Sequence, residues 1–196
     1  MLSKLLGNTK PASIFVVSAP GGTGKTTLVK KLLQEFESIK RSISYTTRTP
    51  RPDEEEGLDY YFISDRQFEE KFQKGDFLEH AKVFDSFYGT DQSQVEKLLN
   101  KGAHVILILD TQGATQVKKK LPKTTLIFIS PPSLDELKER LKKRKKTTHE
   151  SIDWKVELAR KEMEEIPQYD YLIVNDNLDI AYEKLKAILI ANECKM

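Results

Sequence analysis

Short runs of apolar residues recur along the chain, and most of them are followed by a segment with helical periodicity. The clearest runs cover residues 13–18, 105–110, 125–130 and 171–175, and they are rich in Val, Ile, Leu and Phe without strict alternation. Such runs are typical of strands that are covered on both faces. Strands that alternate with helices form βαβ units, so the pattern predicts an α/β fold with a mostly parallel sheet flanked by helices.

Three of the segments that follow carry apolar side chains at helical spacing, which predicts one buried face for each helix. Ser133 and Glu136 have the spacing of a capping box, so one of these helices is expected to begin there. The expected faces are Leu28, Leu32, Leu33 and Phe36 in residues 25–36, Leu134, Leu137 and Leu141 after residue 133, and Ile180, Leu185, Ile188 and Leu189 in residues 178–190.

Residues 44–100 interrupt this alternation. They contain an acidic turn at residues 53–56, a predicted helix that Ser64 and Gln67 open, and a predicted strand at residues 76–84. We interpret this segment as a small α+β insertion on the α/β core. A basic helix predicted over residues 138–146 is a second segment outside the strand–helix alternation. By charge alone, it is most simply a solvated helix face.

Composition and charge fit a single soluble domain. The chain has 196 residues, 38% of them hydrophobic, and a formal net charge of +2. This near-balance of charge gives no general attraction to nucleic acid, and no apolar run approaches the ~20 residues of a membrane span. Cys194 is the single cysteine, which excludes an intramolecular disulfide and fits a reducing compartment. We expect a cytoplasmic protein that binds neither nucleic acid nor membrane.

A glycine-rich segment lies between the first predicted strand and the first predicted helix. Its sequence nearly matches the P-loop pattern G-x-x-x-x-G-K-[ST], in which converging backbone N–H groups bind phosphate. Ala19 replaces the first glycine, which requires a φ that is not positive. The alternative is a glycine-rich turn without a ligand. The expected ATP-binding residues are Ala19, Pro20, Gly21, Gly22, Thr23, Gly24, Lys25, Thr26 and Thr27.

Two residues are candidates to bind Mg²⁺. The Thr26 hydroxyl holds the position of the P-loop metal ligand. Asp110 ends the apolar run 105–110, and in P-loop proteins a carboxylate at the end of a neighbouring strand steadies the metal. Such an aspartate is about as often a helix N-cap, so the assignment depends on the P-loop. The three histidines lack metal-ligand spacing, and we expect surface or packing roles for them.

Five further motifs follow one another along the chain. They are Ser-Tyr-Thr-Thr-Arg-Thr-Pro-Arg at residues 44–51, Gly-Leu-Asp-Tyr-Tyr-Phe at 57–62, Phe-Leu-Glu-His-Ala at 77–81, Tyr-Gly-Thr at 88–90 and Asp-Thr-Gln-Gly at 110–113. With these motifs in this order, the chain strongly resembles guanylate kinase from about residue 12 to residue 192.

The resemblance implies transfer of the γ-phosphoryl group from MgATP to GMP, giving ADP and GDP. It also implies a P-loop nucleoside monophosphate kinase-like core with a GMP-binding insertion and a helical lid. The core would comprise residues 1–43, 101–134 and 168–196, the insertion residues 44–100, and the lid with its following helix residues 135–167. No obligate protein partner is expected.

Residue by residue, the resemblance places the GMP phosphate on Arg48, Arg51, Tyr60 and Tyr88, and guanine on Ser44, Glu79 and Thr90. Arginine suits this phosphate because its planar donors match phosphate oxygens. A carboxylate suits guanine because it can accept from both N1–H and the 2-amino group. The adenine N1 lone pair would instead face the Glu79 charge, so Glu79 is expected to set the choice of base.

The resemblance also assigns the basic helix and two more positions. Arg140 and Arg144 match lid arginines that stabilise charge on the transferred phosphoryl group, and Asn175 matches the segment that lines the adenine of ATP. Lys155 stands where the family usually has Arg, and Ile108 stands where it has an acidic residue. The expected catalytic residues are Lys25, Arg48, Arg140, Arg144 and Lys155.

Two alternatives stay open at this point. One is another small-molecule kinase on the same scaffold, which would have no need of Glu79 together with Ser44 and Thr90. The other is a guanylate-kinase-like module that binds phosphorylated peptides without catalysis. Such a module would be expected to lose the P-loop, whereas Lys25 and Thr26 are present.

Overall fold

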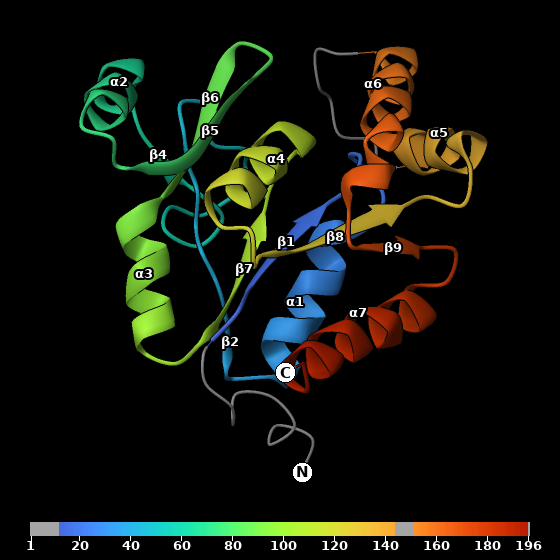
Figure 1. Cartoon of the computed structure of the whole chain (residues 1–196). Coiled ribbons are helices and arrows are strands. Elements are labelled where there is room, and N and C mark those ends of the chain that lie inside the picture. The colour runs from blue at the N-terminus through green and yellow to red at the C-terminus, as the bar shows by residue number, and fades with distance from the viewer. Residues whose placement is uncertain (1–11, 144–150, 196) are drawn as a thin grey trace.

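A large parallel sheet forms the core of the protein (Figure 1). The computed structural model describes residues 12–143 and 151–195. Neighbouring strands of the sheet all pair in parallel, in the order β2-β7-β1-β8-β9. Its strands are β1 (Ile14–Ser18), β2 (Ile39–Arg41), β7 (His104–Ile108), β8 (Thr125–Ser130) and β9 (Tyr171–Val174).

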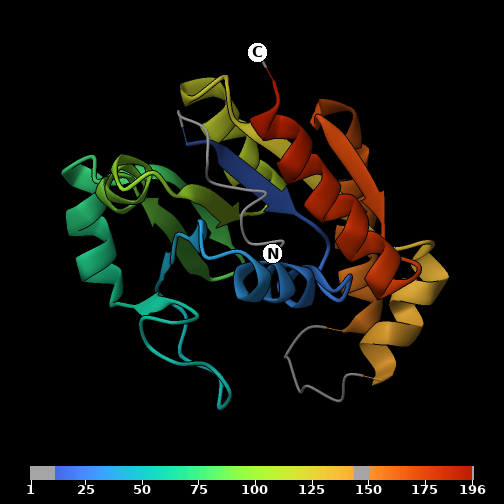
Figure 2. The same cartoon turned by 90° about the horizontal axis from the view of Figure 1, so that it is seen from below.

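Helices cover both faces of this sheet. Phe15 and Val17 of β1 point to one face and pack in one apolar cluster, whereas Ile14 and Val16 point to the other and pack in a second. Figure 2 shows α1 and α7 together on the first face. The covering helices are α1 (Lys25–Glu35) and α7 (Leu178–Glu193) on the first face, and α3 (Gln92–Asn100) and α4 (Thr111–Lys120) on the second.

A second, smaller sheet lies to one side of the core (Figure 1). Its strands lie in the order β4-β3-β6-β5, and the helix α2 (Asp65–Gln73) packs on them. Phe68 of α2 stacks on Phe77 and Phe87, with ring centroids 4.6 and 5.3 Å apart. The strands are β3 (Tyr45–Thr46), β4 (Tyr61–Phe62), β5 (Phe77–Val83) and β6 (Ser86–Asp91).

Two helices lie on the opposite side of the core from this small sheet, as both views show (Figures 1 and 2). They are α5 (Leu134–Lys143) and α6 (Ile152–Glu164), and the 3-10 helix η2 (Ile166–Gln168) follows them. Lys138 of α5 forms an ion pair with Asp153 of α6 at 2.7 Å. We call α5 and α6 the lid helices below.

The structure confirms the predicted fold class and corrects some details. Ser64 and Gln67 form a complete capping box at α2. At α5 only half of the box forms, because the Glu136 carboxylate accepts from Arg140 instead of the backbone at Ser133. Ile180 was expected to be buried, but it is 58% exposed because the first turn of α7 begins before the helix reaches the core.

Candidate active site

The P-loop joins the end of β1 to the start of α1. Gly22 and Gly24 have φ angles of 98° and 90°, which favour glycine because it lacks a Cβ. The Thr23 hydroxyl is buried and donates to the Pro20 carbonyl at 2.6 Å, which fixes the turn. Among the described residues Phe84 alone has a positive φ without being glycine, so Ala19 meets its conformational requirement.

Neighbouring elements approach the P-loop closely. A Cβ at Gly22 would lie 3.0 Å from Cδ2 of Leu141, so α5 packs directly on the loop. A Cβ at Gly24 would lie 2.7 Å from Nδ2 of Asn175. That amide is buried and donates to the Thr23 carbonyl at 2.7 Å. Asn175 therefore supports the loop backbone, and its expected contact with ATP stays a prediction.

Lys25 lies near two carboxylates from distant parts of the chain. Its Nζ donates to the Ala19 carbonyl at 3.4 Å. Burial lowers the pKa of Lys25, and the negative charges of Glu162 on α6 and Asp110 after β7 act in the opposite direction. Burial also disfavours the charged form of Glu162, and for a carboxyl group this raises the pKa. The Lys25 cation and the Glu162 carboxylate thus stabilise each other against the cost of burial, and the negative charge of Asp110 favours the Lys25 cation and opposes the Glu162 anion.

The expected metal ligands lie on neighbouring elements. Thr26 is exposed in the first turn of α1, with Thr27 beside it. Asp110 is the N-cap of α4, because its Oδ1 accepts the Gly113 N–H at 2.8 Å, so Oδ2 is the oxygen left for another ligand. Hydroxyl and carboxylate oxygens suit Mg²⁺, which keeps several waters and takes few protein ligands. The described residues contain no group of three or more His, Cys, Asp or Glu side chains arranged for a metal.

A buried carboxylate lies in the small sheet, facing the core. Glu79 of β5 is 3% exposed, and its Oε1 accepts the Thr90 hydroxyl at 2.6 Å. The Ser44 and Thr90 hydroxyls are 3.4 Å apart, so the three predicted guanine-binding residues meet. Burial raises the pKa of Glu79 to about 7, partly offset by the Thr90 hydrogen bond. A Cβ at Gly113 would lie 2.6 Å from Oε2 of Glu79, which places this carboxylate against the start of α4.

The predicted phosphate-binding residues also converge. The Arg48 Nε donates to the Tyr88 hydroxyl at 3.2 Å, and its guanidinium lies 5.6 Å from the centre of the Tyr60 ring. The Nη2 atom of Arg48 donates to both carboxylate oxygens of Glu54 at 2.9 Å. Glu54 Oε2 also accepts the backbone N–H of Arg51 at 2.9 Å. Glu54, in the acidic turn of residues 53–56, thus fixes the arginine-bearing loop.

The predicted lid residues have separate placements. Arg140 of α5 donates to Oε1 of Glu136 and to the Asn175 carbonyl, each at 2.9 Å, so it joins the lid to the segment after β9. Lys155 lies in the first turn of α6, half-buried. Arg144 lies outside the described residues. The catalytic roles of these three residues remain predictions.

Sequence reasoning missed Glu162 and Glu54. Neither stands in a motif that marks phosphate chemistry, and each belongs to an acid-rich stretch that resembles a solvated surface. Glu54 could have been found from its position three residues after Arg51. Glu162 carries no such signal, because its approach to Lys25 depends on how α6 packs. It brings a second carboxylate, besides Asp110, to the surroundings of Lys25.

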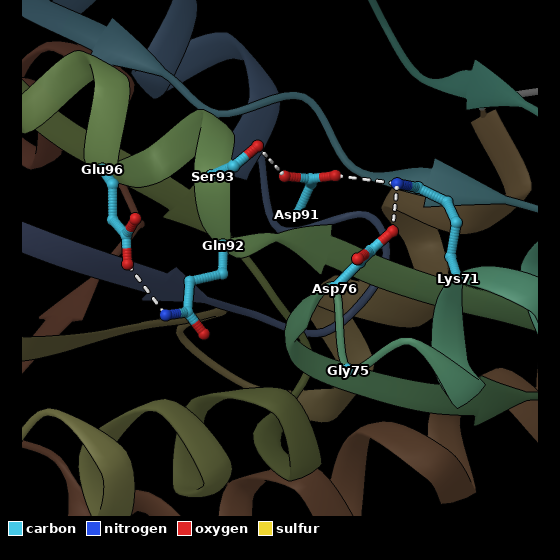
Figure 3. Close-up of a pocket in the computed structure, with 7 residues that line it drawn as sticks. All are labelled: Lys71, Gly75, Asp76, Asp91, Gln92, Ser93 and Glu96. Carbon is cyan, nitrogen blue, oxygen red and sulfur yellow. Dashed lines mark hydrogen bonds and ion pairs between the residues drawn. The ribbon is translucent and has the colours of Figure 1, made fainter.

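A separate pocket of about 370 Å³ is lined by residues of α2, the end of β6 and α3, and none of them is a predicted site residue (Figure 3). Lys71 bridges Asp76 and Asp91 on its wall, at 3.1 and 2.9 Å. Glu96, the remaining charged residue of the lining, accepts a hydrogen bond from the Gln92 amide, so each charged side chain of this wall already has a partner in the protein. Across the described part of the chain, no helix is long and apolar enough to cross a membrane.

Comparison with known proteins agrees with this geometry. The family model for guanylate kinase matches residues 11–192. A guanylate kinase of Protochlamydia amoebophila is 52% identical and covers 94% of this chain and 93% of its own length, and one of Hahella chejuensis is 47% identical at 93% and 88%. The crystal structure of guanylate kinase from Anaplasma phagocytophilum superposes with a TM-score of 0.81 at 33% identity, covering 96% of this chain and 89% of that chain. The chain belongs to the guanylate kinase family.

Proposed function

We propose that this protein is a Mg²⁺-dependent guanylate kinase, which transfers the γ-phosphoryl group of ATP to GMP and releases ADP and GDP. The observation that carries the proposal is the pairing of two sites across the core. One is the P-loop with Lys25, and the other is the buried Glu79–Thr90–Ser44 set. The charge of Asp110, at the start of α4, acts on both Lys25 and Glu79, and Gly113 in the same turn lies against Glu79.

Each side has a defined task in this proposal. The P-loop N–H groups and Lys25 bind the ATP phosphates, with Arg140 on the lid side. Arg48, Arg51, Tyr60 and Tyr88 hold the GMP phosphate, and Glu79 accepts hydrogen bonds from guanine. The protein forms no covalent bond here, so the rate gain comes from positioning and electrostatic stabilisation.

Mg²⁺ fits the residues present, with Thr26 and Asp110 as its holders. When bound, the metal neutralises charge that develops on the phosphates. The relatives that match nearly the whole chain are themselves named guanylate kinases, which argues against a catalytically inactive phosphopeptide module.

The test is to incubate the protein with MgATP and each of GMP, AMP, CMP and UMP, and to measure the ADP formed. ADP should form with GMP alone. Lys25→Ala should lower the rate at least about a hundredfold without unfolding the protein. Glu79→Gln should weaken the preference for GMP over AMP. Turnover with a different acceptor would contradict the guanine site, and an inactive protein would contradict the kinase itself.

A further inference from the structure

Phe84 stands out in the backbone of the described chain. It lies with Asp85 in the tight turn of the β5–β6 hairpin, between the paired residues Val83 and Ser86. Its φ is 58°, in a region that favours glycine and is costly for a bulky side chain. The ring is also 45% exposed, so burial in the core does not explain why a phenylalanine occupies this position.

The partner of this ring belongs to the lid helices and not to the small sheet. Phe84 packs against Trp154 in the first turn of α6, with ring centroids 4.7 Å apart and planes tilted by 48°. Trp154 is itself 42% exposed. In Figure 1 the β5–β6 hairpin and α6 both extend upward from the core. The hairpin belongs to the small sheet, and α6 belongs to the lid helices. The pair therefore connects the small sheet directly to the lid helices.

We propose that Phe84 and Trp154 form an aromatic clasp that couples the GMP side of the site to the ATP side. The proposal rests on the function proposed above. Phosphoryl transfer between two bound nucleotides requires that both sides close together and exclude water. The same hairpin carries Glu79, Tyr88 and Thr90, and the same lid carries Arg140 and Glu162.

A contact between the two sides makes binding on each side favour binding on the other, because each nucleotide then stabilises the same closed arrangement. Neither ring has a place in the proposed nucleotide contacts. Loss of the clasp should therefore leave the affinity for each nucleotide alone unchanged and reduce the coupling between them. From the usual strength of aromatic pairs, the coupling should fall by about two- to tenfold.

The first measurement uses Trp154 as a reporter, since it is the single tryptophan of the chain. Phe84→Ala and Phe84→Gly should shift the Trp154 emission to longer wavelength and increase its quenching by acrylamide. Phe72→Ala is the matched control. Phe72 is 40% exposed, which is similar to Phe84. Its ring packs on His80 of β5, with centroids 4.7 Å apart, and this contact does not involve the lid helices. This control should leave the emission unchanged.

The second measurement is the affinity for GMP with and without a non-hydrolysable ATP analogue. The wild type and Phe72→Ala should bind GMP more tightly when the analogue is present, and both Phe84 variants should lose much of that gain. Phe84→Gly relieves the positive φ whereas Phe84→Ala keeps it. Equal loss of coupling in the two variants, despite different stability, assigns the effect to the ring.

Two results would overturn the clasp. One is an emission spectrum that Phe84→Ala leaves unchanged, because the rings would then not meet in solution. The other is full coupling in both Phe84 variants. A wild-type protein that binds neither nucleotide on its own would instead overturn the proposed function, and this appears in the single-nucleotide titrations before any variant is compared.

Discussion

Glu79 shows how one buried side chain combines a cost in stability with a specific function. It is 3% exposed and accepts a hydrogen bond from the neutral Thr90 hydroxyl, so its charge is poorly compensated in the folded protein. Burial raises its pKa from 4.5 to about 7. A buried carboxylate can accept more hydrogen bonds than Thr90 supplies, so it is suited to a ligand that brings further donors, such as the N1–H and amino group of guanine.

This pKa predicts how stability depends on pH. The folded pKa lies above the unfolded value, so the stabilising contribution of protonated Glu79 is present below about pH 4.5 and is lost as the pH rises through about 7. The loss is about 3 kcal/mol at most. Glu79→Gln should remove this component, so its free energy of unfolding in urea should exceed that of the wild type at pH 8 and approach it at pH 5. Glu37→Gln, which changes an exposed carboxylate, should follow the wild type, and parallel curves for all three proteins would refute the prediction.

At the scale of elements, the P-loop is held from two directions. Leu141 of α5 lies against Gly22, and Asn175 after β9 binds the loop backbone beside Gly24. The loop conformation therefore depends on contacts with α5 and with the segment after β9, as well as on its own glycines. This explains why glycines in the same motif are under different constraints.

Two alanine substitutions separate these constraints. Gly24→Ala places a Cβ 2.7 Å from Nδ2 of Asn175 at a φ of 90°, so it should strain the backbone and break the bond to Thr23. We expect a loss of about 2–4 kcal/mol in the free energy of unfolding. The control is Gly21→Ala, whose Cβ meets nothing within 4 Å, and it should change stability by no more than about 1 kcal/mol. Urea unfolding without nucleotide measures both, and equal effects would show that Asn175 does not constrain the loop.

At the scale of the whole molecule, His104 ties the beginning, middle and end of the chain together. Its Nδ1 accepts the Ser13 backbone N–H at 3.0 Å, so its Nε2 carries the hydrogen that faces Glu193 Oε1 at 2.6 Å. Both side chains are buried. His104 thus has a packing role that depends on polar contacts, because it links the residue just before β1 to β7 and to the C-terminal end of α7.

His104→Ala should accordingly weaken the fold as a unit. It removes two partly buried hydrogen bonds and the edge contact with the Phe15 ring, so we expect a loss of about 2–4 kcal/mol in the free energy of unfolding. Glu183→Ala changes an exposed residue on the same α7 and should cost less than about 1 kcal/mol. Thermal and urea unfolding provide the comparison. Similar small losses in the two variants would mean that the His104 contacts contribute little.

The sequence alone determined the local features of this protein and the identity of its binding motifs. Strand β8 coincides with the predicted residues, and Ser64 caps α2 as its spacing indicates. Such features depend on side-chain periodicity and on hydrogen bonds between near neighbours, so a few consecutive residues suffice to specify them. The P-loop depends likewise on one short segment between a strand and a helix.

Only the tertiary structure decided which distant side chains complete the site. It brought Glu162 to Lys25, Asn175 to the P-loop and Trp154 to Phe84. Each of these contacts depends on the packing of whole helices and sheets against one another, and no local pattern of charge or hydrophobicity records that packing. The motifs therefore identify the ligands expected on each side, and long-range packing determines how the two sides are joined.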